Sequence, residues 1–286
     1  MIPILAVWMA ALSVQAGSAP SPPPRIEWSA AYEPRWDSYS YRFENDSSFG
    51  TAQLVPHFFR QSYDADNQWL VVQARYPVGS QRWRTEFALA PEIVTYGDDF
   101  DTFFQPDGDV ATVGTAGDVS LRSLRFAQRF LAAHHGPVVL VGAYVYRRDR
   151  AEFHPADRVV THTKPPSESR EYITTRETTI SQVHEVRIGV ESGWPLGRAW
   201  RAELNIAAAP TAFARLVTKL PDKYPDRDIV FDAIILAVAA EISLRREWRS
   251  WFVEMRADAD RTWSYASDRQ YERKGYGLTA RIGIRR

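Results

Sequence analysis

Residues 26–36 alternate between apolar and polar side chains with the period of two that is typical of a β-strand. One face would carry Ile26, Trp28, Ala30, Tyr32, Pro34 and Trp36, and the other Glu27, Ser29, Ala31, Glu33 and Arg35. The pattern therefore predicts a strand with one aromatic face and one mostly charged face. It does not by itself say which face meets water, protein or lipid.

Similar segments recur along the chain, and together they predict ten strands. They are residues 26–36, 69–76, 82–96, 121–132, 138–147, 179–191, 199–209, 229–242, 248–256 and 276–285. The run 229–242 also fits a buried helix, because apolar runs of this length do not separate the two structures.

The connections between these segments alternate in length. Short ones occupy residues 77–81, 133–137, 192–198 and 243–247, and long polar ones occupy 37–68, 97–120, 148–178, 210–228 and 257–275. Outer-membrane barrels have this alternation, with short periplasmic turns and long extracellular loops. A soluble sandwich has no reason to place every long loop at one end.

Charge distinguishes the two faces of the predicted strands. One face carries Arg82, Arg84, Glu86, Glu185, Arg187, Glu191, Arg201 and Glu203, and the other carries Trp83, Phe87, Leu89, Ile93, Val186, Ile188, Val190, Trp200, Leu204 and Ile206. A lipid-facing Arg costs about 2–4 kcal/mol at the bilayer midplane, whereas charges of both signs can pair in a lumen. The charged face is therefore predicted to line the interior and the apolar face to meet lipid. Tryptophans near strand ends fit interfacial girdles: Trp28, Trp36, Trp69, Trp83, Trp200 and Trp248.

These patterns predict an all-β fold, a closed antiparallel transmembrane β-barrel of about ten strands over residues 25–286. A soluble exported β-protein is the alternative. Residues 1–19 read as a cleaved signal peptide, with an ordinary buried N-terminal helix as the alternative, and residues 20–24 as a proline-rich spacer. The expected location is the outer membrane. Arg286 ends the last segment, where outer-membrane proteins usually carry an aromatic residue.

Composition excludes several classes of function. Lys+Arg and Asp+Glu both number 35, so no net charge draws the chain to nucleic acid. Cysteine is absent, which excludes thiol catalysis and cysteine-based zinc sites.

The histidines do not form a recognisable site in the sequence. His134 and His135 fall in a short turn and His184 on a lipid-facing position, which favours structural roles. His57, His154 and His162 lie in the first and third long loops, too scattered to predict a metal site. The chain also lacks the HExxH, GxSxG and glycine-rich phosphate-loop motifs.

Aspartates are the stronger candidates. "GDDFDTFF" at 97–104 follows the third strand, and "LPDKYPDRD" at 220–228 lies in the fourth long loop. Paired carboxylates can share a proton, orient a water or hold a cation, although solvated turns are also rich in Asp.

Ten strands, five long loops and an Asp-x-Asp after the third strand resemble the omptins, outer-membrane proteases of Gram-negative bacteria. The resemblance implies an aspartyl-type endopeptidase in which an Asp pair faces an Asp–His pair, and together they activate a water that attacks peptides next to basic residues. By position, Asp99 and Asp101 match the first pair and Asp222 the Asp of the second. It also implies peptide or protein substrates, and outer-membrane lipid or lipopolysaccharide as partner and activator, with no other cofactor.

Tyr224 stands where the resemblance requires the histidine. Tyrosine has a pKa near 10 and cannot replace an imidazole as base at neutral pH. Three readings stay open: an inactive relative, a base supplied by His154 or His162 from the third long loop, or a likeness of shape alone. A non-enzymatic barrel that binds a ligand, lipopolysaccharide or a host surface is the main alternative. A narrow pore and a lipid A hydrolase are further ones.

Overall fold

A computed structural model describes residues 26–44, 58–79, 81–104, 107–135, 138–172, 174–197, 199–221, 228–266 and 268–286. The predicted leader and spacer lie outside these residues. The elements are β1 (Glu27–Glu44), β2 (Phe58–Val78), β3 (Gln81–Phe104), β4 (Val110–His135), β5 (Val138–Phe153), β6 (Asp157–Thr163), β7 (Pro166–Tyr172), β8 (Glu177–Leu196), β9 (Trp200–Lys219), β10 (Ile229–Glu247), β11 (Trp251–Ser264) and β12 (Arg269–Arg285). No helix among the described residues is long and apolar enough to cross a membrane.

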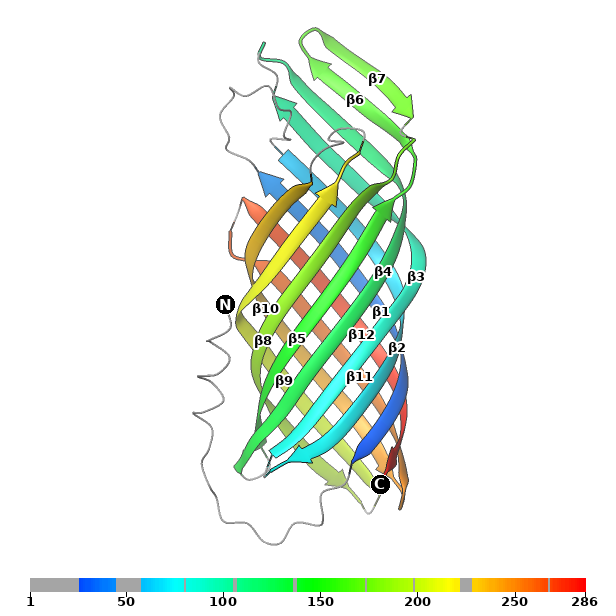
Figure 1. Ribbon diagram of the computed structural model, residues 1–286, viewed down its shortest axis with the longest axis vertical. Helices are drawn as coiled ribbons and strands as arrows, with labels where there is room; N and C mark the ends of the chain where they lie inside the picture. The colour runs from blue at the N-terminus through cyan, green and yellow to red at the C-terminus, as the bar shows by residue number, and fades with distance from the viewer. Residues whose placement is uncertain are drawn as a thin grey trace.

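Ten of these strands close into one antiparallel barrel (Figure 1). β1 pairs with β12, and the pairing of β3 with β4 completes the circuit. The backbones of Ile26 and Arg286 exchange two hydrogen bonds, which joins the two ends of the barrel-forming chain. The predicted ten-stranded barrel is confirmed, and the ambiguous segment 229–242 is the strand β10.

The strands are longer than predicted at the end that carries the long connections, which is the extracellular end of such a barrel. β3 continues to Phe104 and β4 begins at Val110, so most of the predicted second loop is paired backbone. In the third loop the hairpin of β6 and β7 pairs with the top of β4 and extends the wall above the barrel (Figure 1). His134 and His135, predicted in a turn, instead lie in β4 opposite Val139 and Val138.

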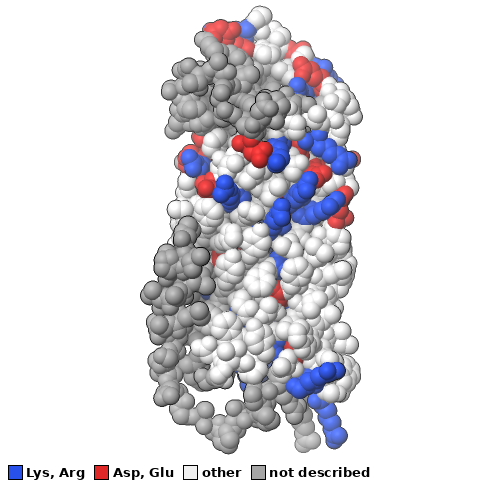
Figure 2. Space-filling model, viewed as in Figure 1, with Lys and Arg blue, Asp and Glu red and all other residues white. Residues whose placement is uncertain are grey.

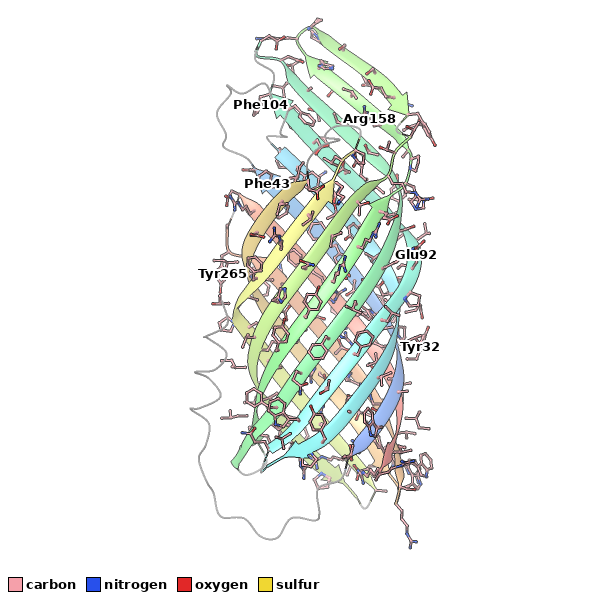
Figure 3. The ribbon with its side chains drawn as sticks, viewed as in Figure 1. Tyr32, Phe43, Glu92, Phe104, Arg158 and Tyr265 are labelled. Atoms are coloured by element: carbon pink, nitrogen blue, oxygen red, sulfur yellow. The ribbon has the colours of Figure 1, made fainter. Side chains whose placement is uncertain are left out.

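The outer surface carries a continuous apolar belt. Trp28, Tyr32 and Trp36 are about half exposed there, and Figure 3 shows Tyr32 projecting from the wall. Figure 2 shows a broad uncharged band with charged side chains concentrated above it. Apolar area of this extent in contact with water would be unstable, so the belt indicates a lipid-facing surface.

The lumen is filled by paired charges, as the alternation predicted. Arg35 is almost completely buried and contacts Glu33, Asp37, Asp258 and Asp260. Further buried ion pairs join Arg125 to Glu33, Arg147 to Asp149, Arg256 to Glu33, Arg273 to Asp37 and Arg281 to Glu254. Each of these buried charges thus has a counter-charge, which low-dielectric surroundings require.

Three details of the predicted faces were wrong. A β-bulge in β3 between Ala90 and Ile93 shifts the alternation by one residue, so Ile93 packs into the lumen. Trp69 is fully buried inside the barrel beneath Arg125 and Arg147, rather than in an interfacial girdle. Arg82 and Arg201 are exposed because they sit at the periplasmic strand ends, where the lumen opens.

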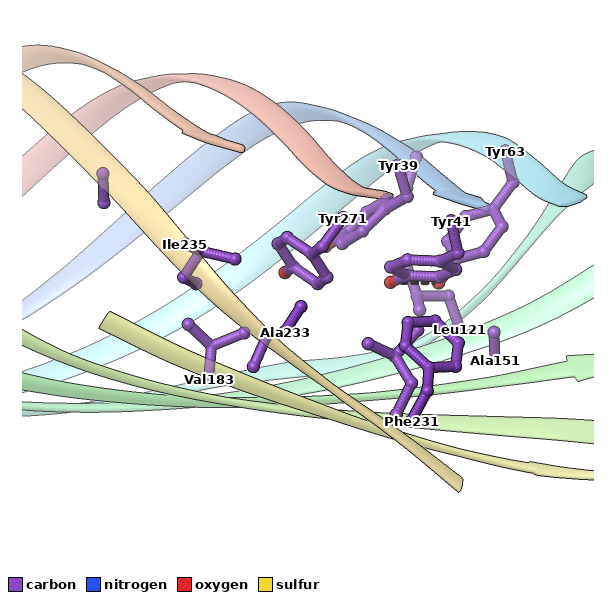
Figure 4. Packing of buried hydrophobic residues seen from close by; sticks show 14 of the residues in the cluster. Tyr39, Tyr41, Tyr63, Leu121, Ala151, Val183, Phe231, Ala233, Ile235 and Tyr271 are labelled. Atoms are coloured by element: carbon purple, nitrogen blue, oxygen red, sulfur yellow. Dashed lines mark hydrogen bonds between the residues drawn. The ribbon is translucent and has the colours of Figure 1, made fainter. Parts of the chain in front are cut away.

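Above the ionic network lies an apolar and aromatic layer (Figure 4). Tyr39 and Tyr63 stack with ring centroids 4.8 Å apart, and the hydroxyls of Tyr41 and Tyr63 are 3.1 Å apart. Leu121, Val183, Phe231 and Ile235 fill the space opposite the tyrosines. This layer separates the lumen charges from the polar groups at the extracellular mouth.

Candidate functional site

Asp99 and Asp101 lie near the extracellular end of β3, and both side chains face the inside of the barrel. Asp99 is 2% exposed and Asp101 0% exposed, whereas Asp98, directly before Asp99, is exposed on the outer face. The period of two of the strand produces this separation. The predicted acidic pair is therefore placed side by side on one inward face.

The register surrounds Asp99 with polar side chains. Asp99 is opposite Gln61 on β2 and Thr115 on β4, and both of these are buried. The Oγ1 of Thr179 on β8 donates a hydrogen bond of 2.7 Å to the Oε1 of Gln61, and it lies 3.0 Å from the Oγ1 of Thr218 on β9. These contacts connect opposite walls of the barrel, so a polar layer closes the lumen beneath the mouth.

The second half of the predicted site is not described. Asp222, Tyr224 and His57 lie outside the described residues. Whether Asp222 faces Asp99 and Asp101 therefore stays a prediction.

His154 lies on the outer side of the wall. Its Nε2 is 2.7 Å from the Oγ of Ser120, and Ser120 faces outward because its neighbours Val119 and Leu121 belong to the interior cluster. His184 is also on the outer face, where its Nδ1 is 2.8 Å from the hydroxyl of Tyr144. The outward position predicted for His184 is confirmed, and neither histidine reaches the lumen.

His162 lies on the inner side of the wall, in a pair with Asp109 that the sequence did not indicate. Its Nδ1 is 2.6 Å from the Oδ2 of Asp109, which is buried at the start of β4. The Oδ1 of Asp109 accepts hydrogen bonds from the amides of Thr163 and Lys164 at 2.7 and 2.8 Å, and from the Thr163 hydroxyl at 3.0 Å. One carboxylate thus holds both the imidazole and the turn between β6 and β7.

These contacts change the acidity of Asp109. The hydrogen bond from His162, opposed by burial and reinforced by the amides of Lys164 and Thr163, holds the pKa of Asp109 well below its ordinary value of 3.8. The carboxylate is therefore ionised throughout the physiological pH range, and it can accept all of these hydrogen bonds at any pH in that range.

An apolar patch lies between the acidic pair and the imidazole. Phe103 on β3, Ala111 and Val113 on β4 and Val160 on β6 pack together. In Figure 3, Phe104 marks the end of β3 and Arg158 marks the start of β6, the two strands that contribute to this patch together with β4. No group of three or more His, Asp or Glu side chains in the described part of the chain could hold a metal ion.

No protein-family model matches the chain, and no curated protein sequence matches it. Among solved structures the fold is similar to that of the outer membrane protease OmpT from Escherichia coli, with a TM-score of 0.63, 8% sequence identity, and coverage of 92% of this chain and 97% of that chain. Neisserial surface protein A and the toluene transporter TodX of Pseudomonas putida cover 89% and 93% of this chain and 97% and 90% of their own, at 8% and 5% identity. Their TM-scores of 0.27 and 0.30 support no argument. The likeness to OmpT shows the fold, and the predicted resemblance in architecture is confirmed.

Proposed function

We propose that this protein is a surface endopeptidase of the outer membrane, exported through residues 1–19 as a signal peptide. The observation that carries the proposal is the enclosed acidic pair, Asp99 and Asp101, on the inner face of the extracellular mouth. The architecture that it shares with a known outer membrane protease supports the same conclusion.

The chemistry of the mouth is suited to peptides with basic side chains. Two carboxylates on one face create a local negative potential, which favours a Lys or Arg side chain and can also orient a water. The surrounding hydroxyl and amide groups of Thr115, Thr179 and Gln61 can bond to an extended peptide backbone. Because the pair is enclosed in this structure, substrate contact requires the mouth to open.

A cleavage assay on the refolded barrel tests the proposal. The protein is refolded in detergent, with and without lipopolysaccharide, and incubated with a quenched fluorescent peptide that contains two adjacent basic residues. Asp99→Asn and Asp101→Asn are expected to lower kcat/KM by about 10²-fold or more. Asp98→Asn is the matched control, since that carboxylate faces outward on the same strand, and it is expected to retain activity. Cleavage that survives both inward substitutions would show that Asp99 and Asp101 do not act in catalysis.

Tyr224 supplies a second arm of the assay. If the site needs an imidazole at that loop position, the natural chain cleaves the peptide hardly at all and Tyr224→His increases turnover. The expected loss from a missing general base is of order 10²–10⁴-fold.

A non-enzymatic binding protein is the second candidate. It is favoured by one observation: within the described residues, His154 and His162 are bonded to Ser120 and Asp109, not to the acidic pair. Such a barrel would bind the same basic peptide and release it intact, so calorimetric binding without any cleaved product would replace the endopeptidase proposal.

Outer-leaflet lipid is the proposed partner of the wall. Arg122, Arg148 and Arg150 are exposed on β4 and β5 directly above the apolar residues Leu124 and Tyr146. Guanidinium groups at that height fit the phosphate groups of lipopolysaccharide. The assay with and without lipopolysaccharide reports whether this contact activates the site.

A further inference from the structure

The pair of Asp109 and His162 has the geometry of an activated imidazole. A carboxylate only accepts hydrogen bonds when ionised, so the short contact assigns the proton to Nδ1 and leaves Nε2 as an acceptor. An imidazole in that tautomer can remove a proton from water at Nε2.

The carboxylate is fixed before any substrate arrives. Three donors hold Oδ1, so Oδ2 is the oxygen that remains for the imidazole. A carboxylate held this way orients the ring and stabilises the imidazolium that forms when a proton is taken up. If Asp109 only anchored the turn between β6 and β7, the contacts of Oδ1 to Thr163 and Lys164 would suffice. The contact of Oδ2 to the imidazole is additional.

The same inward face carries the acidic pair. Asp101 is opposite Val113 on β4, Val113 is opposite Val160 on β6, and His162 lies two residues beyond Val160. Two residues along a strand span about 7 Å and two strand spacings about 10 Å, which places the Cα atoms of Asp101 and His162 about 12 Å apart. An extended peptide of a few residues bridges that distance.

His162 and Asp101 differ in their exposure to solvent. The side chain of His162 is 38% exposed, whereas Asp101 is enclosed beneath the patch of Phe103, Ala111, Val113 and Val160. The imidazole is therefore the member of this wall that solvent and substrate reach first.

We propose that His162 is the general base of the endopeptidase site and that Asp109 is its positioning residue, so the base comes from the β6–β7 hairpin. This inference rests on the proposed function. Nε2 of His162 removes a proton from water while the water oxygen bonds to the peptide carbonyl carbon. The C–N bond then breaks, the imidazolium returns the proton to the leaving nitrogen, and the products are a carboxylic acid and an amine.

Three variants separate this role from a structural one. His162→Asn keeps an amide N–H where Nδ1 donates to Asp109, so the anchor survives but the base is lost. Asp109→Asn keeps the size of the side chain and removes its charge. His154→Ala is the matched control, because that imidazole lies on the outer side of the wall.

Two readouts are needed, both on the full refolded barrel. In the cleavage assay, His162→Asn is expected to lower kcat by about 10²–10⁴-fold with little change in KM, and Asp109→Asn to lower kcat by up to about 10⁴-fold. His154→Ala is expected to change neither. The rise of kcat/KM with pH on the acid limb, which reports the neutral imidazole, is expected to disappear in His162→Asn.

The second readout is the imidazole itself. Nitrogen-15 NMR of the neutral His162 ring is expected to show the proton on Nδ1 in the natural chain and a weaker preference for that tautomer in Asp109→Asn, because the carboxylate that accepts from Nδ1 is gone. The other charged groups of the hairpin and of the turn before β4 are unchanged in this comparison: Asp107, Asp157, Arg158, Lys164, Glu168, Arg170 and Glu171.

The outcomes separate the inference from the proposed function. Cleavage that persists in His162→Asn with its acid limb intact overturns the inference and leaves the endopeptidase standing. An increase of turnover in Tyr224→His that does not depend on His162 does the same, since the base then comes from the fourth long loop. No cleavage at any pH by the natural chain or by Tyr224→His overturns both. Loss of cleavage in the His162 and Asp109 variants, with His154→Ala unchanged and with Asp99→Asn and Asp101→Asn also impaired, supports both.

Discussion

At the scale of single residues, the interior is governed by the need to pair every buried charge. Arg35 contacts four carboxylates, and Gly275 on β12 leaves room for it: an added Cβ there would lie 2.5 Å from the Arg35 Nη2 atom. Arg35 therefore depends on the absence of a side chain on a neighbouring strand, and the sequence alone does not reveal this dependence.

Removing Arg35 is expected to destabilise the barrel strongly. Arg35→Met would leave Glu33, Asp37, Asp258 and Asp260 with less positive charge in a low-dielectric lumen, at a cost of about 3–5 kcal/mol.

The measurement is the free energy of unfolding in urea with the barrel in lipid vesicles. Arg215→Met is the control, because Arg215 is half exposed and its nitrogen is 3.9 Å from Asp232, a pair worth about 0–1 kcal/mol. Equal losses in the two variants would contradict the account of the lumen.

Sequence reasoning could place Asp99 and Asp101 but not Asp109 and His162. Asp-x-Asp at the end of a strand puts both carboxylates on one face, a consequence of the strand period that can be read directly. Asp109 and His162 are 53 residues apart, and they meet only because a hairpin pairs with the top of β4. No local spacing encodes that contact.

At the scale of elements, the transmembrane strands could be predicted and their extracellular extensions could not. Inside the membrane one face must be apolar and the other polar, which produces strict alternation. Above the membrane both faces meet water or protein, so β6 and β7 lack alternation and their pattern predicts a loop. Their sequences are "DRVVTHT" and "PSESREY". The bulge before Ile93 is not visible in the alternation either: Pro91 and Glu92 are both exposed, and they shift the inward and outward positions of β3 by one residue.

The β6–β7 hairpin is expected to depend on the charge of Asp109. Folding lowers the pKa of Asp109, so the ionised carboxylate stabilises the hairpin fully at any pH above 3.8, the ordinary pKa of an Asp side chain. This contribution is lost only as the pH falls through the lower pKa that Asp109 has in the folded protein. The amides of Thr163 and Lys164 are therefore expected to stay protected from hydrogen exchange at pH 5, and to lose protection in Asp109→Ala.

Asp118→Ala is the control for hydrogen exchange, since Asp118 is exposed on the outer face of β4. Protection at Thr163 and Lys164 that is unchanged in Asp109→Ala would mean that backbone pairing of β6 with β4 suffices to hold the hairpin.

At the scale of the whole molecule, the apolar belt and the charged lumen reverse the arrangement of a soluble protein. The belt is continuous because every barrel strand contributes outward apolar residues, and the lumen contains charges because they are paired across strands.

A ten-stranded barrel has a narrow interior that side chains can fill. One lumen cavity, lined by Arg129, Arg187, Asn205 and Glu241 among others, measures about 20 Å³. That is room for about one water molecule.

The filled lumen argues against the pore considered from the sequence. In planar lipid bilayers the natural barrel is expected to show no steady ion conductance, because an ion would have to displace Arg35, Arg147 and Arg273 from their carboxylates. Folding is verified separately by faster migration of the unheated protein on an SDS gel. A double substitution, Arg35→Ala with Arg273→Ala, is expected to give transient conductance, since it removes two guanidinium groups that share Asp37 and Asp260. Stable conductance of the natural barrel would show instead that the interior network opens in a membrane, and that the protein transports small solutes through it.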